Sequence, residues 1–417
     1  MLECIIQLMT PNVWITGGIV LLTFIGIAIG RYPIIKSNRT TIALMGVALL
    51  LVTRQVQFEQ LPAYIDFDTI ILLFSMMIIN ANLKLAGFFS LASRWLVRWS
   101  RSARSFLAVE ILLAGVLSAL FLNDTICLMF APFLINLMDT MKRNPIPYLI
   151  ALATAANVGS TATLTGNPQN MIVGIASGIS YVDFSLALIP VALLGLGVIW
   201  LVLVKMFPYD FDRKPLQTLP EQEFDSVQKP LLIKTLLITA GLLAAFLAGA
   251  PIALSAFLAA SLLLITRRHQ PQTVFAEFDW SLLVFFSALF IVSGSLETSG
   301  VTARLINVNT LADRINIWNL SLISAGLSNL VSNVPAVLLL KPLVSVLENA
   351  HIGWLTLASA STLAGNLTLL GSVANLIVAE TASRYRVDLS FWKYTKPGFV
   401  ITLITLAIDI AWLYLIA

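Results

Sequence analysis

A carboxylate interrupts the apolar stretch SALFLNDTICLMFAPFL, where Asp124 stands between Asn123 and Thr125. If this stretch lies inside a membrane, an ionised Asp124 costs several kcal/mol, so the group should carry a proton, bind a cation, or do both. This chemistry is typical of a proton carrier. The alternative is that Asp124 only caps the helix that follows, since Asp is a preferred N-cap residue.

A related segment lies in the second half of the chain. LNDTICLMFAPFL matches SNVPAVLLLKPLV, which aligns Asn123 with Asn333. Each segment is expected to form a helical hairpin with these polar residues at its tip. The candidate residues for proton or cation coupling are Asp124, Asn123, Asn333 and Ser332, with sodium near the first three as the alternative to a proton.

Two further segments mix glycines with short polar side chains. GSTATLTGNPQN covers residues 159–170, and AGNLTLLGSVAN covers residues 364–375. Backbone polar groups in lipid must be paired, so such a helix break survives only where it is buried in protein or lines a cavity. The N–H groups and carbonyls that a break frees can hold a polar solute and a cation. The candidate solute-binding residues are Asn123, Thr125, Ser160, Thr161, Thr163, Gly166, Asn167, Pro168, Asn170, Asn333, Asn366, Thr368, Gly371, Ser372 and Asn375. For each Ser and Thr among them, a purely capping role stays open.

The composition places these segments in a membrane. The chain has 417 residues, of which 58% are hydrophobic and 11% charged, and its mean hydropathy is +0.91. A soluble domain cannot hide so much apolar surface, whereas a transmembrane helix needs about 20 mostly apolar residues. We expect about ten such spans and a pair of hairpins. Residues 1–11 lack the basic segment of a signal peptide, so the first span should stay in the mature protein.

The sequence carries no pattern of an enzyme. We find no nucleophile–base pair, metal cluster or phosphate-binding loop, and therefore expect no cofactor. Cys4 and Cys127 are too far apart for a disulfide framework, and neither His269 nor His351 is expected to bind a metal. Three charged residues interrupt apolar spans and should pair across helices or reach the interface; they are Glu110, Lys341 and Asp409.

The two halves of the chain read as repeats. The matched segments recur at an offset of roughly 205 to 213 residues, and so does FD, at Phe67–Asp68 and Phe278–Asp279. With an odd number of crossings in each half, the second copy would insert upside down. The predicted fold is an all-α membrane protein of two inverted repeats, each with five transmembrane helices and one re-entrant hairpin.

The predicted boundaries follow from these matches. Repeat 1 (1–205) holds scaffold helices in 13–85, a re-entrant hairpin in 105–140, a broken helix in 147–177 and a last helix in 183–205. A polar linker covers 206–230. Repeat 2 (231–417) holds scaffold helices in 231–298, a re-entrant hairpin in 317–348, a broken helix in 353–380 and a last helix in 396–417.

The basic residues predict the orientation. When the loops are assigned alternately to the two sides, all but four of the 25 Lys and Arg residues fall on one side, many of them in a loop from Lys84 to Arg104. The exceptions are Arg54, Arg304, Arg314 and Lys341. By the positive-inside rule this side is cytoplasmic, so both termini should lie outside an inner (plasma) membrane and the linker inside. The net charge of +4 is thus a topology signal and does not indicate a nucleic-acid partner.

At these motifs the chain resembles the ion-transporter superfamily, which includes the arsenite permease ArsB, the plant silicon efflux transporters, the NhaD sodium/proton antiporters and the divalent-anion/sodium symporters. The resemblance runs over nearly the whole length. It is strongest to the plant silicon (silicic acid) efflux type, through SALFLNDT, LIALATAANVGSTATLTGNPQN, SNVPAVLLL and STLAGNLTLLGSVANLIVAE.

The resemblance implies a homodimer in which scaffold helices hold a transport domain of hairpin, broken helix and last helix, which moves as an elevator. In the anion/sodium symporters each hairpin tip carries Ser-Asn-Thr. Here Leu122 replaces the Ser of the first tip and Val334 the Thr of the second, which weakens the case for a dicarboxylate and sodium.

Three functions stay open. The first is proton-coupled efflux of a small neutral oxyacid, silicic acid or arsenite, with Asp124 alternately protonated and ionised. The solute hydroxyls would then meet Asn123, Asn333, Thr163 and Thr368. An ionised Asp124 would repel an anion at 4 Å by about 4 kcal/mol, at an effective dielectric of about 20. The other two are a sodium-coupled symporter of a di- or tricarboxylate or sulfate, and a Na⁺/H⁺ antiporter.

Overall fold

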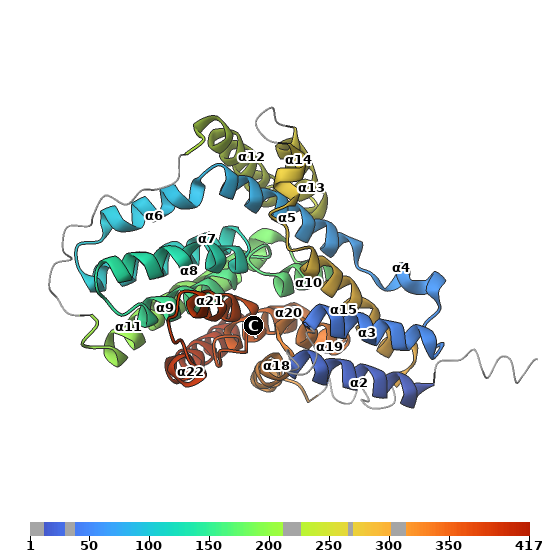
Figure 1. The fold of residues 1–417 in the computed structure, drawn as a ribbon. Coiled ribbons are helices and arrows are strands. Elements are labelled where there is room, and N and C mark those ends of the chain that lie inside the picture. Colours follow the sequence, from blue (N-terminus) through green and yellow to red (C-terminus); the bar gives the residue numbers. More distant parts are fainter. Residues whose placement is uncertain (1–11, 30–37, 212–226, 266–269, 302–313) are drawn as a thin grey trace, which may run out of the picture.

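The computed structural model describes residues 12–29, 38–211, 227–265, 270–301 and 314–417, and its secondary-structure elements in these ranges are all helices (Figure 1). Cys4, His269, Arg304 and residues 212–226 of the predicted linker lie outside them. The helices of the first half are α2 (Val13–Ile29), α3 (Arg39–Val52), the 3₁₀-helix η1 (Phe58–Gln60), α4 (Leu61–Tyr64), α5 (Phe67–Leu85), α6 (Phe88–Trp99), α7 (Ala103–Leu120), α8 (Asn123–Thr140), α9 (Ile146–Ser160), α10 (Pro168–Ser177) and α11 (Tyr181–Met206).

The second half repeats much of this order. Its helices are α12 (Lys229–Leu247), α13 (Ile252–Leu264), α14 (Pro271–Phe275), α15 (Trp280–Thr298), α18 (Ile317–Val331), α19 (Asn333–Val344), α20 (Ala350–Ala364), α21 (Val373–Arg384) and α22 (Phe391–Ile416). Among the described helices, α5, α7, α11, α12, α15 and α22 are each long and apolar enough to cross a membrane, and six shorter ones are also apolar. The chain is therefore a multi-pass membrane protein.

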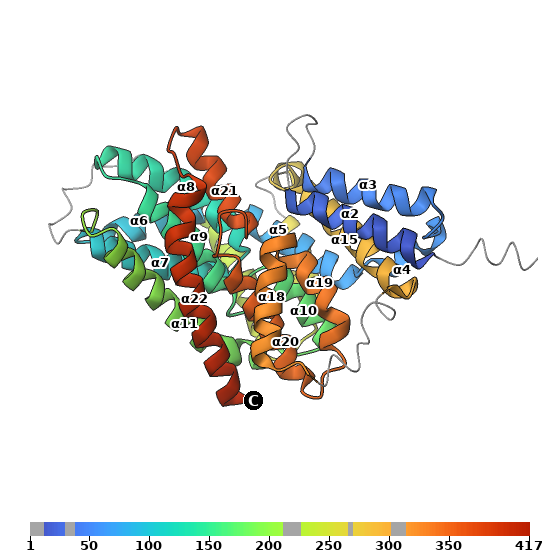
Figure 2. The same cartoon turned by 90° about the horizontal axis from the view of Figure 1, so that it is seen from below.

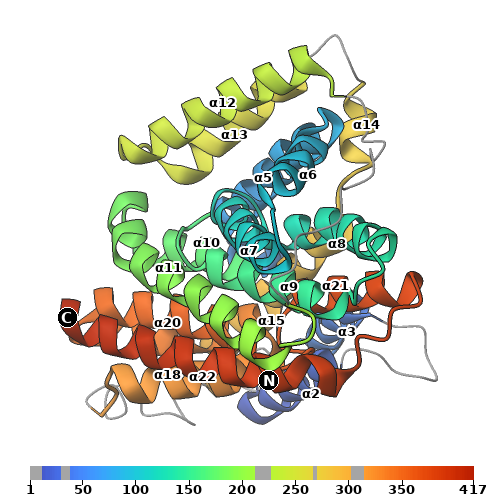
Figure 3. The ribbon, with the colours of Figure 1, turned by 90° about the vertical axis from the view of Figure 1, so that its left-hand side faces the viewer.

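The helices pack in two groups. Figure 2 shows α2, α3 and α15 on the side of the molecule away from α11 and α22, and Figure 3 shows α12 beside α13. In the first group α5 packs against α13 and α3 against α15, while α2 and α12 cover α3 and α13. In the second group α7 packs on α9, α18 on α20, α8 on α21, and α11 on α22. Contacts of α5 with α10 and of α15 with α19 join the groups. The half-helix after the first break and the second hairpin thus lie where the two groups meet.

Capping aspartates set the start of two central helices. Asp66 accepts a hydrogen bond from the Thr69 N–H at 3.1 Å at the start of α5, and Asp279 accepts one from the Leu282 N–H at 3.2 Å at the start of α15. The FD recurrence pairs Asp279 with Asp68 instead, two residues further along the chain. The capping position aligns Asp66 with Asp279, because a cap needs the residue just before the helix.

Helix α6 corrects the expected loop from Lys84 to Arg104. Its buried residues Phe89, Ala92 and Leu96 recur at helical spacing, while Arg98 is exposed. Two of the basic residues, Arg94 and Arg98, lie on the exposed polar face of this amphipathic helix and not in a loop.

The hairpin connections are very short. Only Phe121 and Leu122 separate α7 from α8, and Ser332 alone separates α18 from α19. Ser332 has φ 81° and ψ 160°, a conformation almost restricted to glycine. Both tips are therefore tightly folded, and the second stores backbone strain.

Glycines let α7, the first helix of the first hairpin, pack closely against α9 and α11. A Cβ added at Gly159 of α9 would lie 2.2 Å from the backbone oxygen of Gly115 on α7, and one added at Gly115 would lie 2.7 Å from Leu196. Small residues allow this close approach between membrane helices, where packing replaces the hydrophobic effect.

We predict that Gly159→Ala destabilises the protein by about 1–3 kcal/mol, because the backbone of Gly115 cannot move aside as a flexible side chain would. The measurement is the thermal unfolding midpoint in detergent. Gly197→Ala on α11 is the matched control, since a Cβ there meets no atom within 4 Å; an equal loss in both variants would contradict the packing argument.

Candidate functional site

The first helix break lies between α9 and α10, and an asparagine ties its loose backbone together. The Asn170 amide nitrogen donates to the backbone oxygens of Ser160 at 3.0 Å and Thr163 at 2.9 Å. Asn167 caps α10 by accepting from the Asn170 N–H at 2.8 Å, and it donates to the Ser160 hydroxyl at 2.9 Å. Gly166 is required here, because a Cβ would lie 2.4 Å from the Ser160 oxygen.

The second break, between α20 and α21, uses the same bonds. The Asn375 amide nitrogen donates to the backbone oxygens of Gly365 at 2.7 Å and Thr368 at 3.1 Å. Ser372 caps α21, and a Cβ at Gly371 would lie 2.7 Å from the Gly365 oxygen. In both breaks the carbonyls that the interruption frees are paired by an asparagine of the following half-helix.

Asn157 of α9 connects the two breaks. Its amide nitrogen donates to the side-chain oxygens of Asn366 at 2.9 Å and Asn375 at 3.0 Å. Its amide oxygen accepts from the Asn123 amide at 3.0 Å and from the Ser372 hydroxyl at 3.0 Å. These bonds use both donors and both acceptor sites of the amide. The breaks and the first hairpin tip therefore meet around one fully buried side chain.

Thr362 of α20 makes the reciprocal connection. Its hydroxyl accepts from Gln169 at 3.1 Å and from Asn167 at 3.4 Å, both in the first break. In the amide orientation that satisfies its polar atoms, Asn333 of the second tip accepts from Gln169 at 3.2 Å and donates to the Gly371 oxygen at 3.1 Å. The second tip is thus joined to a half-helix of the first half of the chain, whereas the first tip bonds to Asn157 of its own half.

Asp124 lies in the first turn of α8 and does not cap it. Leu122 occupies the N-cap position, and the Asp124 N–H donates to the Asn123 side-chain oxygen at 3.0 Å. No side chain or backbone group in the described ranges donates a hydrogen bond to the Asp124 carboxylate. The negative charge of Asp124 is favourable at a helix N-terminus. Because no described group hydrogen-bonds the carboxylate, its oxygens are available to a ligand.

A cavity of about 880 Å³ opens in front of Asp124. Both tips and both breaks line it, through Asn123, Asp124, Pro168, Gln169, Ser332, Asn333, Leu370 and Ser372. Each of these residues lies at or beside the start of α8, α10, α19 or α21. The N-termini of four helices therefore converge on one cavity and make it favourable to electron-rich oxygen atoms.

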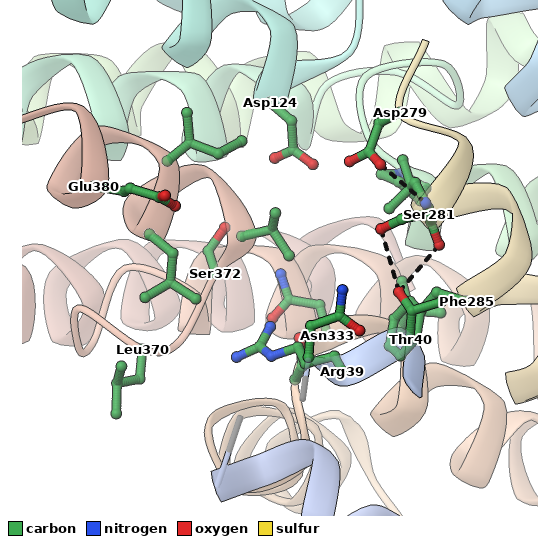
Figure 4. Close-up of a pocket in the computed structure, with 18 of the residues that line it drawn as sticks. Arg39, Thr40, Asp124, Asp279, Ser281, Phe285, Asn333, Leu370, Ser372 and Glu380 are labelled. Carbon is green, nitrogen blue, oxygen red and sulfur yellow. Dashed lines mark hydrogen bonds between the residues drawn. The ribbon is translucent and has the colours of Figure 1, made fainter. Parts of the chain in front are cut away.

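The other wall of the cavity comes from α3 and α15. Figure 4 shows Asp279 beside Asp124, with Arg39 near Asn333 across the same space. The Thr40 hydroxyl bonds to the Ser281 backbone oxygen at 3.2 Å, which holds the starts of α3 and α15 together. Within the described part of the chain, no carboxylate forms an ion pair with Arg39.

The predicted site residues divide into two sets. Those that line the cavity are Asn123, Asp124, Pro168, Ser332, Asn333 and Ser372. Those that hold the breaks and tips together behind it are Thr125, Ser160, Thr161, Thr163, Gly166, Asn167, Asn170, Asn366, Thr368, Gly371 and Asn375. Thr163 donates its hydroxyl to the Ala119 backbone oxygen and Thr368 donates to the Asn329 amide oxygen at 3.4 Å, so both hydroxyls have protein partners.

Sequence reasoning missed Asn157, Thr362, Gln169, Arg39 and Asp279 as site residues. Asn157 and Thr362 offered a signal, because each is a polar residue within an apolar span. They also match each other in the two repeats, at the same sequence offset as the two helix breaks. Arg39 was interpreted only as a loop charge. Of the remaining charges in apolar spans, Asp409 pairs across helices with the Ser359 hydroxyl at 2.8 Å, and Glu110 is buried without a described hydrogen-bond partner.

Comparisons with known proteins fit this architecture. A family model described as CitMHS, citrate transporter, matches residues 19–364. The silicon efflux transporter LSI3 of Oryza sativa subsp. japonica is 30% identical, over 91% of this chain and 93% of its own length. A Dictyostelium discoideum protein with the name arsB transporter is 25% identical, over 89% of this chain and 86% of its own. These similarities confirm the resemblance that the motifs indicate.

A solved structure shares the fold. The YdaH transporter of Alcanivorax borkumensis, described as having an unusual topology, superimposes with a TM-score of 0.61 at 13% identity. The superposition covers 97% of this chain and 98% of that one. At this identity the likeness concerns the arrangement of the helices alone.

We predict that Asn157→Ala lowers stability strongly, because four buried groups lose their partner at a cost of about 1–3 kcal/mol for each one left unpaired. The measurement is thermal unfolding in detergent. The matched control is Asn136→Ala, an exposed asparagine on α8. Equal midpoints for the two variants would show that Asn157 does not hold the breaks together.

Proposed function

Because the chain belongs to the CitMHS citrate transporter family, we propose that it is a secondary active transporter that exports a small neutral oxyacid, silicic acid or arsenite, in exchange for protons. The observation that carries the proposal is the Asp124 carboxylate, which no described group hydrogen-bonds and which lines the cavity between both tips and both breaks. A relative named as a silicon efflux transporter and another with the name arsB support the solute class.

The chemistry of the cavity supports a solute with several hydroxyls. An ionised Asp124 accepts hydrogen bonds from hydroxyl groups, and the N-termini of α8, α10, α19 and α21 attract the oxygen atoms of the same solute. Protonation of Asp124 removes its negative charge, turns one oxygen into a donor and so weakens that binding. Proton and solute would therefore compete for the same carboxylate, which is the condition for exchange.

The bonds within the site also support the inverted repeats. Asn170 and Asn375 bond equivalent backbone oxygens at the same offset, and the pair of α5 with α13 has a counterpart in the pair of α15 with α3. We assign α2, α3, α5, α12, α13 and α15 to the scaffold, and the hairpins, broken helices, α11 and α22 to an elevator-type transport domain. The domain boundaries and the homodimer of the sequence analysis are part of this proposal.

The charges at the cavity support one orientation. Arg39 and Arg384 line the cavity, and both belong to the basic side of the chain. In an inner membrane with the linker in the cytoplasm and both termini outside, the cavity would face the cytoplasm. This is the state in which an exporter takes up its solute.

A second candidate is a symporter of an organic anion such as citrate. Arg39, which has no ion-pair partner in the described part of the chain, together with four helix N-termini favours a negative solute. The description of the family model points the same way. The carboxylates of Asp124 and Asp279 in the same cavity count against it, since an anion beside them is repelled.

For the proton role we predict that Asp124→Asn abolishes coupling. In proteoliposomes, uptake of silicic acid or arsenite driven by a pH gradient should fall at least about tenfold and lose its sensitivity to a protonophore, because the amide cannot exchange a proton. Asp139→Asn, on the exposed end of the same helix, is the control and should transport normally. Gradient-driven uptake that survives in Asp124→Asn refutes proton coupling at this residue.

For the solute charge we predict that Arg39→Gln leaves the KM for silicic acid within about threefold, whereas a carboxylate solute bound to Arg39 would lose about 1.5–3 kcal/mol, or tenfold or more in KM. Transport of silicic acid and of citrate is measured side by side. The control is Arg98→Gln on α6, which is exposed and remote from the cavity. Saturable citrate uptake that Arg39→Gln alone destroys favours the anion symporter.

A further inference from the structure

A second cavity, of about 400 Å³, lies between α4, the end of α15 and α19. Its polar lining includes Gln60, Tyr64, Ser293, Glu297, Thr298 and Lys341. None of these residues lines the first cavity. Lys341 is one of the charges that the sequence places inside an apolar span and that the function above does not use.

Both cavities lie along the same pair of helices. On α15, Ser281 faces the first cavity and Ser293 the second, about 18 Å further along the helix at 1.5 Å per residue. On α19, Asn333 faces the first and Lys341 the second, about 12 Å further on. The turns between them carry Leu289 and Val337, which are fully buried. An apolar barrier therefore separates two polar chambers.

The second cavity has the chemistry of a solute site. Its two charged residues, Lys341 and Glu297, have opposite sign, and neither forms an ion pair with another residue of the described ranges. The Ser293 hydroxyl is buried without a hydrogen-bond partner, whereas buried polar groups normally have one.

One wall of the second cavity is rigid. The Tyr64 hydroxyl bonds to the Thr298 hydroxyl at 3.1 Å, and a Cβ at Gly294 would lie 2.5 Å from the Tyr64 ring. The ring therefore fits against α15 and fixes α4 at the mouth. The opposite wall, with Lys341, belongs to the second hairpin, which the proposed function assigns to the moving domain.

We propose that this cavity is a vestibule that binds the same small, uncharged oxyacid at the other end of the transport path, on the side of the membrane opposite to the first cavity. The inference rests on the proposed solute transport and is independent of proton coupling. Lys341 and Gln60 donate hydrogen bonds to the solute oxygens, and Glu297 accepts from a solute hydroxyl. Their charges cancel, which suits a neutral solute.

Cysteine labelling tests the position of the vestibule. In a full-length Cys4→Ser, Cys127→Ala background, a membrane-impermeant maleimide should label Ser281→Cys from one side of sealed vesicles and Ser293→Cys only from the other. The matched control is Val284→Cys, on the exposed face of α15, which should react from neither side. Labelling of Ser293→Cys from the side that labels Ser281→Cys, or from neither side, overturns the proposal.

Protection by silicic acid tests binding. At about four times its dissociation constant, silicic acid should slow the labelling of Ser293→Cys about fivefold, because only the free site reacts. Protection of Ser281→Cys without protection of Ser293→Cys overturns the vestibule and leaves the proposed function standing. Failure of protection at both positions overturns both.

Kinetics separate a binding role of Lys341 from a structural one. Lys341→Gln should raise the KM for silicic acid by about tenfold when transport starts from the side that labels Ser293→Cys, in line with the loss of a charged hydrogen bond. The KM from the other side should stay unchanged. Equal changes from both sides, or none, overturn the role of Lys341.

Discussion

The need to pair backbone polar groups inside lipid governs this structure. Each interrupted helix frees carbonyls that water cannot reach, and unpaired groups there cost several kcal/mol. Asn170 and Asn375 pair those carbonyls within their own halves, and Asn157 then joins the halves through three side-chain bonds, to Asn366, Asn375 and Ser372. Each break therefore pairs its own loose carbonyls, and the bonds of Asn157 hold the two breaks against each other.

The same requirement shapes the cavity. Once the side-chain amides have paired the loose carbonyls, the helix starts at the two tips and two breaks are left facing one space. The scaffold adds Arg39 and Asp279 at fixed positions, held by the bond between Thr40 and Ser281. One wall of the cavity therefore consists of the hydrogen-bonded tips and breaks. The other wall carries the charges of Arg39 and Asp279, which are not part of that hydrogen-bond network. In the proposed mechanism these two walls move relative to each other.

Local sequence motifs made the bonded breaks and tips partly predictable. The cavity wall formed by α3 and α15 could not be predicted in this way. Glycines and short polar residues within apolar spans identify breaks and tips from sequence, because few other reasons place them there. The detailed role of each residue was harder to infer. Thr163 and Thr368 bond to protein groups, and only the fold reveals which hydroxyls remain exposed to the cavity. Arg39 and Asp279 lie far from Asp124 in sequence and resemble an ordinary loop charge and an ordinary helix cap. Helix α6 was missed because its arginines obscured the spacing of its buried residues.

The two tips differ in one respect that concerns energy supply. The first carries Asp124, whereas the second has the uncharged Val334 in the equivalent turn. Under the proposed exchange, one proton crosses the membrane for each neutral solute, so every cycle carries one net positive charge inward. A membrane potential of 100 mV, negative inside, then adds about 2.3 kcal/mol per cycle to whatever the pH gradient supplies. With a single titratable group at its tips, the carrier would be driven by voltage even where the two sides have the same pH.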